Sequence, residues 1–243
     1  MPFAYYGAKH NLARKYPKPQ HDVIVEPFAG SAAYSVKWAT DSTHVILYDA
    51  DPAVVELWHR LQSMTTSDLN ALDRHAAHDA ITCDPLVAAS GGGTSLAATL
   101  AGRSRVITPR MRKDWPALRK RIERALPRVR RWEINHGAYH EAPTMNATWF
   151  IDPPYSVHEL GYSSVNDASG NGYRHGASGI DYRHLADWCT SRHGQVIVCE
   201  QAPANWLPFT AFHEQLNAQN DARTEVVWTN DGWYAPIQTT LFQ

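Results

Sequence analysis

The sequence predicts an α/β fold built around a mostly parallel sheet. Two short apolar runs, at residues 22–26 and 44–49, have the composition of buried strands, and a helical pattern follows each of them. Strand, helix, strand and helix at this spacing are typical of a right-handed parallel crossover. Hydrophobic residues make up 44% of the 243 residues, which is enough to bury a sizeable core.

The two helices of this unit carry start signals. Ser31 is expected to cap a helix that runs to about Trp38. Asp51 is expected to be the N-cap of the second helix, with Pro52 in its first turn, where a helix needs no backbone donor.

The second half of the chain is predicted to complete the sheet. Further strands are expected at residues 131–134, 148–152 and 195–199, with a helix over 181–192 before the last of them. Residues 224–228 and 237–242 are separated by Asn230-Asp231-Gly232, which predicts a terminal antiparallel hairpin.

Residues 63–130 interrupt the alternation of strands and helices. Asp114-Trp115-Pro116 is typical of a helix start, and Trp115, Leu118, Ile122 and Leu126 then follow at helical spacing. We therefore expect an inserted, mostly helical subdomain at 63–130, and a catalytic domain formed by residues 1–62 and 131–243.

Positive charge is concentrated in this insert, although the whole chain has a net charge of −1. Residues 103–131 hold twelve Lys and Arg against Asp114 and Glu123, so the segment carries +10 and the rest of the chain −11. A basic block on an acidic body is typical of nucleic-acid binding, and a solvated helix face is the alternative. The residues expected to contact DNA are Arg103, Arg105, Arg110, Arg112, Lys113, Arg119, Lys120 and Arg124.

Composition indicates a cytoplasmic protein without a metal. No apolar stretch approaches the roughly 18–20 residues that span a bilayer, and the first residues lack a secretory pattern. The three cysteines are too few and too widely spaced to suggest a disulfide framework or a zinc site, and the thirteen histidines show no ligand spacing.

The first candidate site follows the first strand. The run Glu26-Pro27-Phe28-Ala29-Gly30-Ser31 contains a turn glycine, and Asp49 ends the next strand about 20 residues later. A carboxylate in this position can bind ribose hydroxyls, while the glycines that admit a pyrophosphate are missing. The pattern favours a nucleoside ligand without a diphosphate, and an ordinary turn with a surface aspartate is the alternative.

The second candidate site is Asp152-Pro153-Pro154-Tyr155, directly after an apolar strand. Two prolines fix the backbone and remove two donors, so the segment cannot extend the sheet. An Asp carboxylate and a Pro carbonyl can accept both hydrogens of an exocyclic amine, and a Tyr ring can stack on a flipped base. The alternative is a proline-rich turn.

Together, the two strand ends resemble those of the Dam-like family of DNA adenine-N6 methyltransferases, over most of the chain. Residues 25–30 are similar to the family's cofactor loop, Asp49 to its ribose-binding acid, 152–155 to its catalytic tetrapeptide and 5–9 to its N-terminal aromatic-glycine-lysine motif. Ala32 stands where a second glycine is frequent, and Ala138 where an Asp is common.

The resemblance implies a Rossmann-like S-adenosylmethionine methyltransferase that acts on adenine N6 in double-stranded DNA, as a monomer or dimer, with the insert as target-recognition subdomain. The catalytic residues it implies are Asp152, Pro153 and Tyr155; the cofactor-binding residues are Tyr5, Gly7, Lys9, Glu26, Phe28, Gly30, Asp49 and Asp152. Methylation of RNA adenine or cytosine N4, and a non-catalytic DNA-binding regulator with the same fold, stay open as alternatives. A nicotinamide oxidoreductase is disfavoured by the missing glycines.

Overall fold

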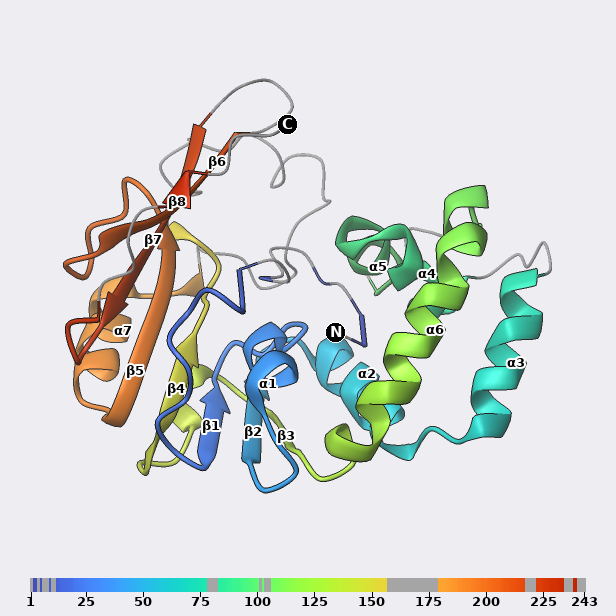
Figure 1. Cartoon of the computed structure of the whole chain (residues 1–243), viewed down its shortest axis with the longest axis horizontal. Coiled ribbons are helices and arrows are strands. Elements are labelled where there is room, and N and C mark those ends of the chain that lie inside the picture. The colour runs from blue at the N-terminus through green and yellow to red at the C-terminus, as the bar shows by residue number, and fades with distance from the viewer. Residues whose placement is uncertain are drawn as a thin grey trace.

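In the computed structural model, an eight-stranded sheet lies beside a group of helices (Figure 1). The structure describes residues 2–3, 5, 9, 12–77, 83–100, 102, 106–156, 179–216, 222–233 and 238–239. Within these residues, no helix is long and apolar enough to cross a membrane.

The sheet has the strand order β3-β2-β1-β4-β5-β7-β6-β8. Its strands are β1 (Val23–Glu26), β2 (His44–Asp49), β3 (Glu133–His136), β4 (Asn146–Ile151), β5 (His193–Gln201), β6 (Thr210–Leu216), β7 (Ala222–Thr229) and β8 (Gln238–Thr239). From β3 to β5 all neighbours are parallel, whereas β7 runs antiparallel to both β5 and β6. The fold is therefore the predicted mixed α/β fold with a mostly parallel sheet.

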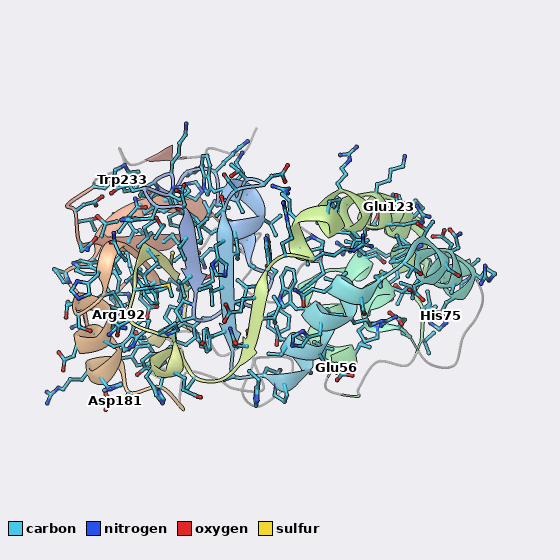
Figure 2. The ribbon with its side chains drawn as sticks, turned by 90° about the horizontal axis from the view of Figure 1, so that it is seen from below. Glu56, His75, Glu123, Asp181, Arg192 and Trp233 are labelled. Carbon is cyan, nitrogen blue, oxygen red and sulfur yellow. The ribbon has the colours of Figure 1, made fainter. Side chains whose placement is uncertain are left out.

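The helices are α1 (Ala33–Trp38), α2 (Pro52–Ser63), α3 (Thr66–Ala77), α4 (Pro85–Ala88), α5 (Gly93–Leu100), α6 (Pro109–Val129) and α7 (Tyr182–Thr190). Two short 3-10 turns, η1 (Ala89–Gly91) and η2 (Tyr139–Glu141), complete the described set. Seen from below, α2, α3 and α6 gather at one end of the molecule, marked by Glu56, His75 and Glu123, and α7 lies at the other (Figure 2).

The central strands bury both of their faces, because alternate side chains enter two different hydrophobic clusters. Ile24, Leu47 and Phe150 belong to the cluster that also contains side chains of α1 and α2. Their neighbours Val25 and Trp149 belong to the cluster formed with α7. Strands covered on both sides read as continuous apolar runs, which is why the sequence located β1, β2, β4 and β5.

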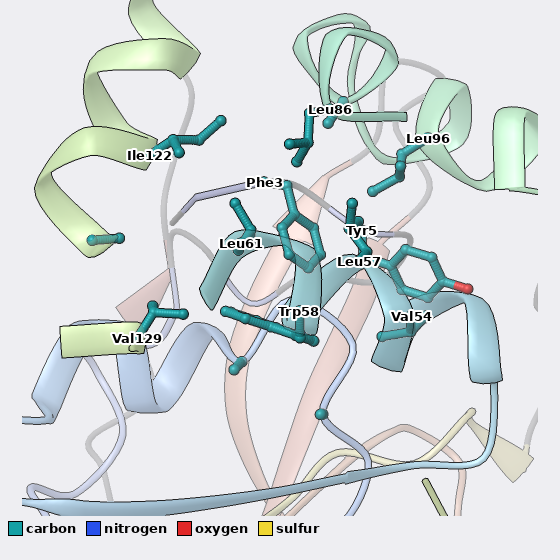
Figure 3. Packing of buried hydrophobic residues seen from close by; sticks show 14 of the residues in the cluster. Phe3, Tyr5, Val54, Leu57, Trp58, Leu61, Leu86, Leu96, Ile122 and Val129 are labelled. Atoms are coloured by element: carbon teal, nitrogen blue, oxygen red, sulfur yellow. The ribbon is translucent and has the colours of Figure 1, made fainter. Parts of the chain in front are cut away.

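The helices of residues 66–129 share a hydrophobic core with α2 and with the N-terminal segment. Phe3 packs on Trp58, with ring centroids 4.9 Å apart. The same cluster contains Leu86 of α4, Leu96 of α5 and Ile122 of α6 (Figure 3). The helical segment thus packs on the sheet domain through α2.

Helix α6 begins five residues earlier than the sequence predicted. Thr108 caps it through a hydrogen bond from the Met111 N–H, 3.2 Å long, and Pro109 occupies the first helical position. The expected start at Asp114 was wrong because Thr-Pro is the stronger start signal. The four predicted core positions, Trp115, Leu118, Ile122 and Leu126, are all buried.

The terminal hairpin has different strands from those predicted. The strand expected at 224–228 lies within β7, but its antiparallel partner along the chain is β6, which the sequence analysis did not identify. In the second expected strand, 237–242, the described residues form β8, which pairs in parallel with β6. Asn230, directly after β7, instead bonds the interior strand β5, where its side-chain oxygen accepts a hydrogen bond from the Val196 N–H at 2.9 Å.

Gly194 is the glycine on which the β4–β5 contact depends. Its φ is +97°, and a Cβ placed on it would lie 2.2 Å from the Ala147 carbonyl oxygen on the neighbouring strand. We expect Gly194→Ala to lower the free energy of unfolding by about 3 kcal/mol or more, because the strained backbone and the clash act together. Urea denaturation followed by circular dichroism measures this.

The matched control is Gly232→Ala, whose φ is +70° but whose Cβ would meet no atom within 4 Å. This variant should lose only about 1–2 kcal/mol, the cost of a left-handed alanine. Equal losses in the two variants would show that the close approach to β4 is unimportant.

Candidate functional site

The candidate site lies at the carboxyl ends of β1 and β4. These neighbouring parallel strands sit where the strand order reverses, since the chain continues from β1 to β2 on one side and from β4 to β5 on the other (Figure 1). Open parallel sheets bind their ligands at such a switch point. Both motifs singled out in the sequence follow these two strands.

Lys9 is the centre of the site. Its ammonium lies 3.0 Å from Asp152 Oδ1 and 3.3 Å from Glu225 Oε1, and it donates a hydrogen bond to the Tyr155 hydroxyl. The ammonium also lies 4.4 Å from the centroid of the Tyr155 ring. Lys9 is only 7% exposed, so its charge is balanced mainly by these partly buried groups and not by water.

Asp152, the first residue of the tetrapeptide, has a raised pKa. The net pKa is about 6: burial raises it most, the charges of Glu225 and Glu200 also raise it, and the adjacent Lys9 ammonium lowers it. The carboxyl is therefore mostly ionised at pH 7 and becomes neutral in mildly acidic solution. In its ionised form it can accept hydrogen bonds from an amine.

Side chains of α7 and β5 hold the backbone of the tetrapeptide and of the residue after it. The Tyr182 hydroxyl donates to the Pro154 carbonyl at 2.5 Å. Glu200 Oε2 accepts from the Ser156 N–H at 3.0 Å and from the Trp206 indole at 2.9 Å. These bonds hold the backbone on both sides of Tyr155.

The turn after β1 connects directly to Asp49. Gly30, whose φ is +45°, donates its N–H to Asp49 Oδ2 at 2.8 Å, and the Asp51 N–H donates to Oδ1 at 2.9 Å. The Trp58 indole donates to the Gly30 carbonyl at 2.9 Å. The Gly30 N–H is therefore directed at a carboxylate and not at a phosphate.

Ala32 begins α1 in place of the predicted cap. It has a left-handed backbone, with φ 46°, and its helix start has no side-chain cap, so the expectation that Ser31 caps α1 was wrong. Left-handed geometry costs an alanine about 1–2 kcal/mol. A glycine, which has no Cβ, would adopt this conformation without that cost.

Glu26 braces the same turn from inside. Its carboxylate is 2% exposed and accepts a hydrogen bond from the Ser35 N–H at 2.7 Å, in the first turn of α1. Burial raises its pKa to about 8, against the smaller opposing effect of the Ser35 hydrogen bonds. The geometry makes Glu26 a buried support for the turn after β1 and not an exposed group.

Aromatic side chains line the β1–β3 side of the site. Phe28 stacks on Tyr139 with centroids 5.5 Å apart and ring planes 26° from parallel. The Tyr139 hydroxyl is 2.6 Å from His184 Nδ1, which fixes the ring. Tyr5 is buried, and its ring lies against Gly30, 3.5 Å from the place of a Cβ on that residue. Gly7 lies outside the described residues.

Among the predicted DNA contacts, α6 separates exposed from internally bound side chains. The exposed ones, together with Arg121, which was not predicted, form what we call the α6 basic face: Arg110, Lys113, Lys120, Arg121 and Arg124. At 3.6 residues per turn they fall within roughly 100° of the helix circumference. They point away from the buried side, which contains Met111, Leu118 and Ile122.

Two predicted contacts lie off this face, and two lie outside the described residues. Arg119 is bound internally, at 2.9 Å from Asp73 and 2.7 Å from Glu123, and Arg112 is half-buried. Arg103 and Arg105 belong to the part of the chain that the structure does not describe. Helical periodicity thus selects fewer candidate DNA-contacting residues than the net charge of the segment does.

Sequence reasoning missed Glu225 and Tyr16, and it gave Glu200 no role. The Glu225 carboxylate accepts from the Tyr155 hydroxyl at 2.5 Å and from the Tyr16 hydroxyl at 3.0 Å. No clear signal marked Glu225 in the sequence, because it alternates along β7 with Arg223, Val227 and Thr229, and a glutamate on a mostly polar strand face does not stand out.

Comparison with known proteins gave no relative: neither the protein-family models nor the curated proteins contain a match to this chain. Within the described residues, no group of three or more His, Cys, Asp or Glu side chains is arranged to hold a metal ion. The geometry of the site is therefore the basis for a functional conclusion.

The raised pKa of Glu26 makes the stability depend on pH. Between 4.5, the ordinary glutamate value, and about 8, the folded protein holds a proton that the unfolded chain has released. The free energy of unfolding therefore falls as pH rises through this window, by up to about 1.4 kcal/mol per pH unit for one group. We expect Glu26→Gln to flatten this decline between pH 6.5 and 8, where Asp152 contributes little.

Thermal unfolding at several pH values measures the effect, with Glu56→Gln, at an exposed position of α2, as control. The control should keep the slope of the unsubstituted protein. Parallel slopes for Glu26→Gln and the unsubstituted protein would contradict a protonated Glu26.

Proposed function

We propose that this protein is an S-adenosylmethionine-dependent DNA methyltransferase that modifies N6 of adenine. The observation that carries the proposal is the meeting of Lys9, Asp152 and Tyr155 at the end of β4, beside the Gly30–Asp49 turn at the end of β1. A nucleoside-binding turn and an amine-binding carboxylate at one switch point are what transfer between two adenine-bearing ligands requires.

The residues around β1 fit the cofactor. Asp49 provides a carboxylate for ribose hydroxyls, Phe28 and Tyr139 provide an apolar surface for an adenine ring, and Gly30 keeps the turn free of a side chain. When bound, S-adenosylmethionine supplies an electrophilic methyl group on a positively charged sulfur. Glu26 and Ala32 act indirectly, by fixing the shape of the turn.

The residues around β4 fit the acceptor amine. Asp152 and the Pro153 carbonyl accept the two N6 hydrogens, which localises the nitrogen lone pair, and Tyr155 stacks on the base. Catalysis is then mainly a matter of positioning. The proton that N6 loses after methylation passes to Asp152, whose raised pKa of about 6 makes it a better acceptor than an ordinary aspartate.

The α6 basic face supports DNA as the substrate. Its five exposed cations lie along a helix of 21 residues, which is about 31 Å long at 1.5 Å per residue, so they can follow several phosphates of one strand. We assign the helical segment 63–130 to target recognition on this ground.

Replacing Asp152 tests the catalytic assignment. We expect Asp152→Asn to reduce methyl transfer to adenine by about 100-fold or more, because the amide cannot accept both an amine hydrogen and the released proton. The affinity for S-adenosylmethionine, measured by calorimetry, should change little. Labelled methyl transfer to unmethylated genomic DNA, with digestion to nucleosides, gives the activity and the product.

Asp187→Asn, at an exposed position of α7, is the control and should keep full activity. Formation of N4-methylcytosine, or incorporation into RNA alone, would replace the adenine assignment. Cofactor binding without transfer to any nucleic acid would favour a non-catalytic regulator.

The DNA-binding assignment predicts a change in salt dependence. The double variant Lys120→Gln/Arg124→Gln should weaken duplex binding and reduce the slope of log affinity against log salt by up to about 2, since each phosphate contact contributes about 0.9. Fluorescence anisotropy between 50 and 200 mM salt measures this slope. Arg183→Gln, at an exposed position of α7, is the control and should leave the slope unchanged. An unchanged slope in the double variant would exclude the α6 basic face as the DNA-binding surface.

A further inference from the structure

We propose that Glu225, on the antiparallel strand β7, is a positioning residue that fixes the Tyr155 ring and divides the Lys9 charge between two carboxylates. The inference deepens the proposed function and rests on it. It gives β7 a positioning role in the reaction, although this strand carries none of the motifs found in the sequence.

Three donors converge on one oxygen of Glu225. Oε1 accepts from the Tyr155 hydroxyl at 2.5 Å and from the Tyr16 hydroxyl at 3.0 Å, and the Lys9 ammonium lies 3.3 Å away. Charge-assisted hydrogen bonds of this kind are about twice as strong as neutral ones. Glu225 thus joins β7, the N-terminal segment and the tetrapeptide at a single point.

The strands on both sides of β7 hold Glu225 in place. It lies opposite Gln201 of β5 and His213 of β6. The β6 ladder is irregular at this point, where the register shifts between Ala211 and His213 and Phe212 is the extra residue. Such bulges occur next to active sites, where they redirect side chains.

The bulge brings side chains of β6 to the N-terminal segment. Phe212 stacks on Tyr16, with centroids 4.5 Å apart and planes 18° from parallel, and His213 Nδ1 is 3.2 Å from the Lys15 ammonium. Tyr16 is thereby fixed by its ring and by its hydroxyl. Tyr16 donates to the Glu225 carboxylate. The contacts that fix Tyr16 therefore also fix the group that accepts the hydrogen bond of Tyr155.

The first consequence concerns the ring of Tyr155. A tyrosine held only at its Cβ can swing about its first side-chain bond, whereas a bonded hydroxyl at the far end of the ring fixes the direction in which the ring points. A stacking surface for a base requires a fixed ring position, and displacement of about 1 Å costs on the order of 100-fold in rate. Glu225 supplies this anchor without reaching the ligand itself.

The second consequence concerns Asp152. Lys9 is shared between Asp152 at 3.0 Å and Glu225 at 3.3 Å, so it does not bind Asp152 alone. The titratable groups that face Asp152 come from five segments: Lys9 and Tyr16 from the N-terminal segment, Glu26 from β1, Tyr155 from the tetrapeptide, Cys199 and Glu200 from β5, and Glu225 from β7. Of these, Glu225 raises the pKa of Asp152 and Lys9 lowers it.

The test is Glu225→Gln, with Glu214→Gln as matched control, because Glu214 is an exposed glutamate on the neighbouring strand β6. For Glu225→Gln we expect kcat to fall by about 10- to 100-fold, with the KM for S-adenosylmethionine unchanged. The acidic limb of the pH–rate profile should also move to lower pH, because Asp152 loses a negative neighbour and gains a larger share of Lys9. Glu214→Gln should change none of these.

A double-mutant cycle separates positioning from a general loss of stability. Tyr155→Phe keeps the ring but removes the hydroxyl that Glu225 holds, so the losses from the two single variants should not add in Glu225→Gln/Tyr155→Phe. If Glu225→Gln does not fold, as judged by thermal unfolding, Tyr155→Phe alone must reproduce the fall in kcat, and an unchanged kcat overturns the inference.

Spectroscopy of 3-fluorotyrosine-labelled protein gives a readout that is independent of activity. The ¹⁹F resonance of Tyr155, assigned with Tyr155→Phe, should shift in Glu225→Gln and not in Glu214→Gln. An unshifted resonance, or unaltered kcat and pH profile in a folded Glu225→Gln, overturns the inference. Absence of methyl transfer by the unsubstituted protein would refute the proposed function instead, and the resonance would still test the contact.

Discussion

The buried ammonium of Lys9 is the interaction on which the site depends. Asp152 and Glu225 are partly buried carboxylates, and without the cation between them two like charges would lie close together with little water to screen them. Lys9 lets both remain close to one another and to Tyr155. The N-terminal segment is therefore part of the site. Phe3, in the same segment, is buried against Trp58 and connects the segment to the helical core.

Much of the fold follows from local sequence. The bounds of β2 agree with the prediction, and β1, β4 and β5 differ only at their ends, because strands covered on both faces are continuous apolar runs. Asp51 caps α2 as expected, since the Asp-Pro signal is local. Strand β6 was missed because its sequence, TAFHEQL, alternates poorly around the bulge at Phe212.

The site was predictable in part, for the same reason. Asp152 and Tyr155 are in one motif, and Asp49 ends a strand, so their types and spacing were informative. Glu225 is 70 residues beyond Tyr155, and only the sheet order brings the two together. Glu26 was predicted among the cofactor-binding residues, and the structure shows it buried; no pattern in the sequence distinguishes a buried support from an exposed ligand.

Because of the bulge at Phe212, the insertion or deletion of a residue should disturb β6 more than a substitution does. Side chains in a strand alternate between faces, so adding or removing one residue inverts the face of everything on one side of the change. Loss of Phe212 would restore a regular ladder with β7 while separating the strand from Tyr16. Over evolutionary time, homologous strands should therefore accept many substitutions here but conserve the number of residues between Thr210 and His213.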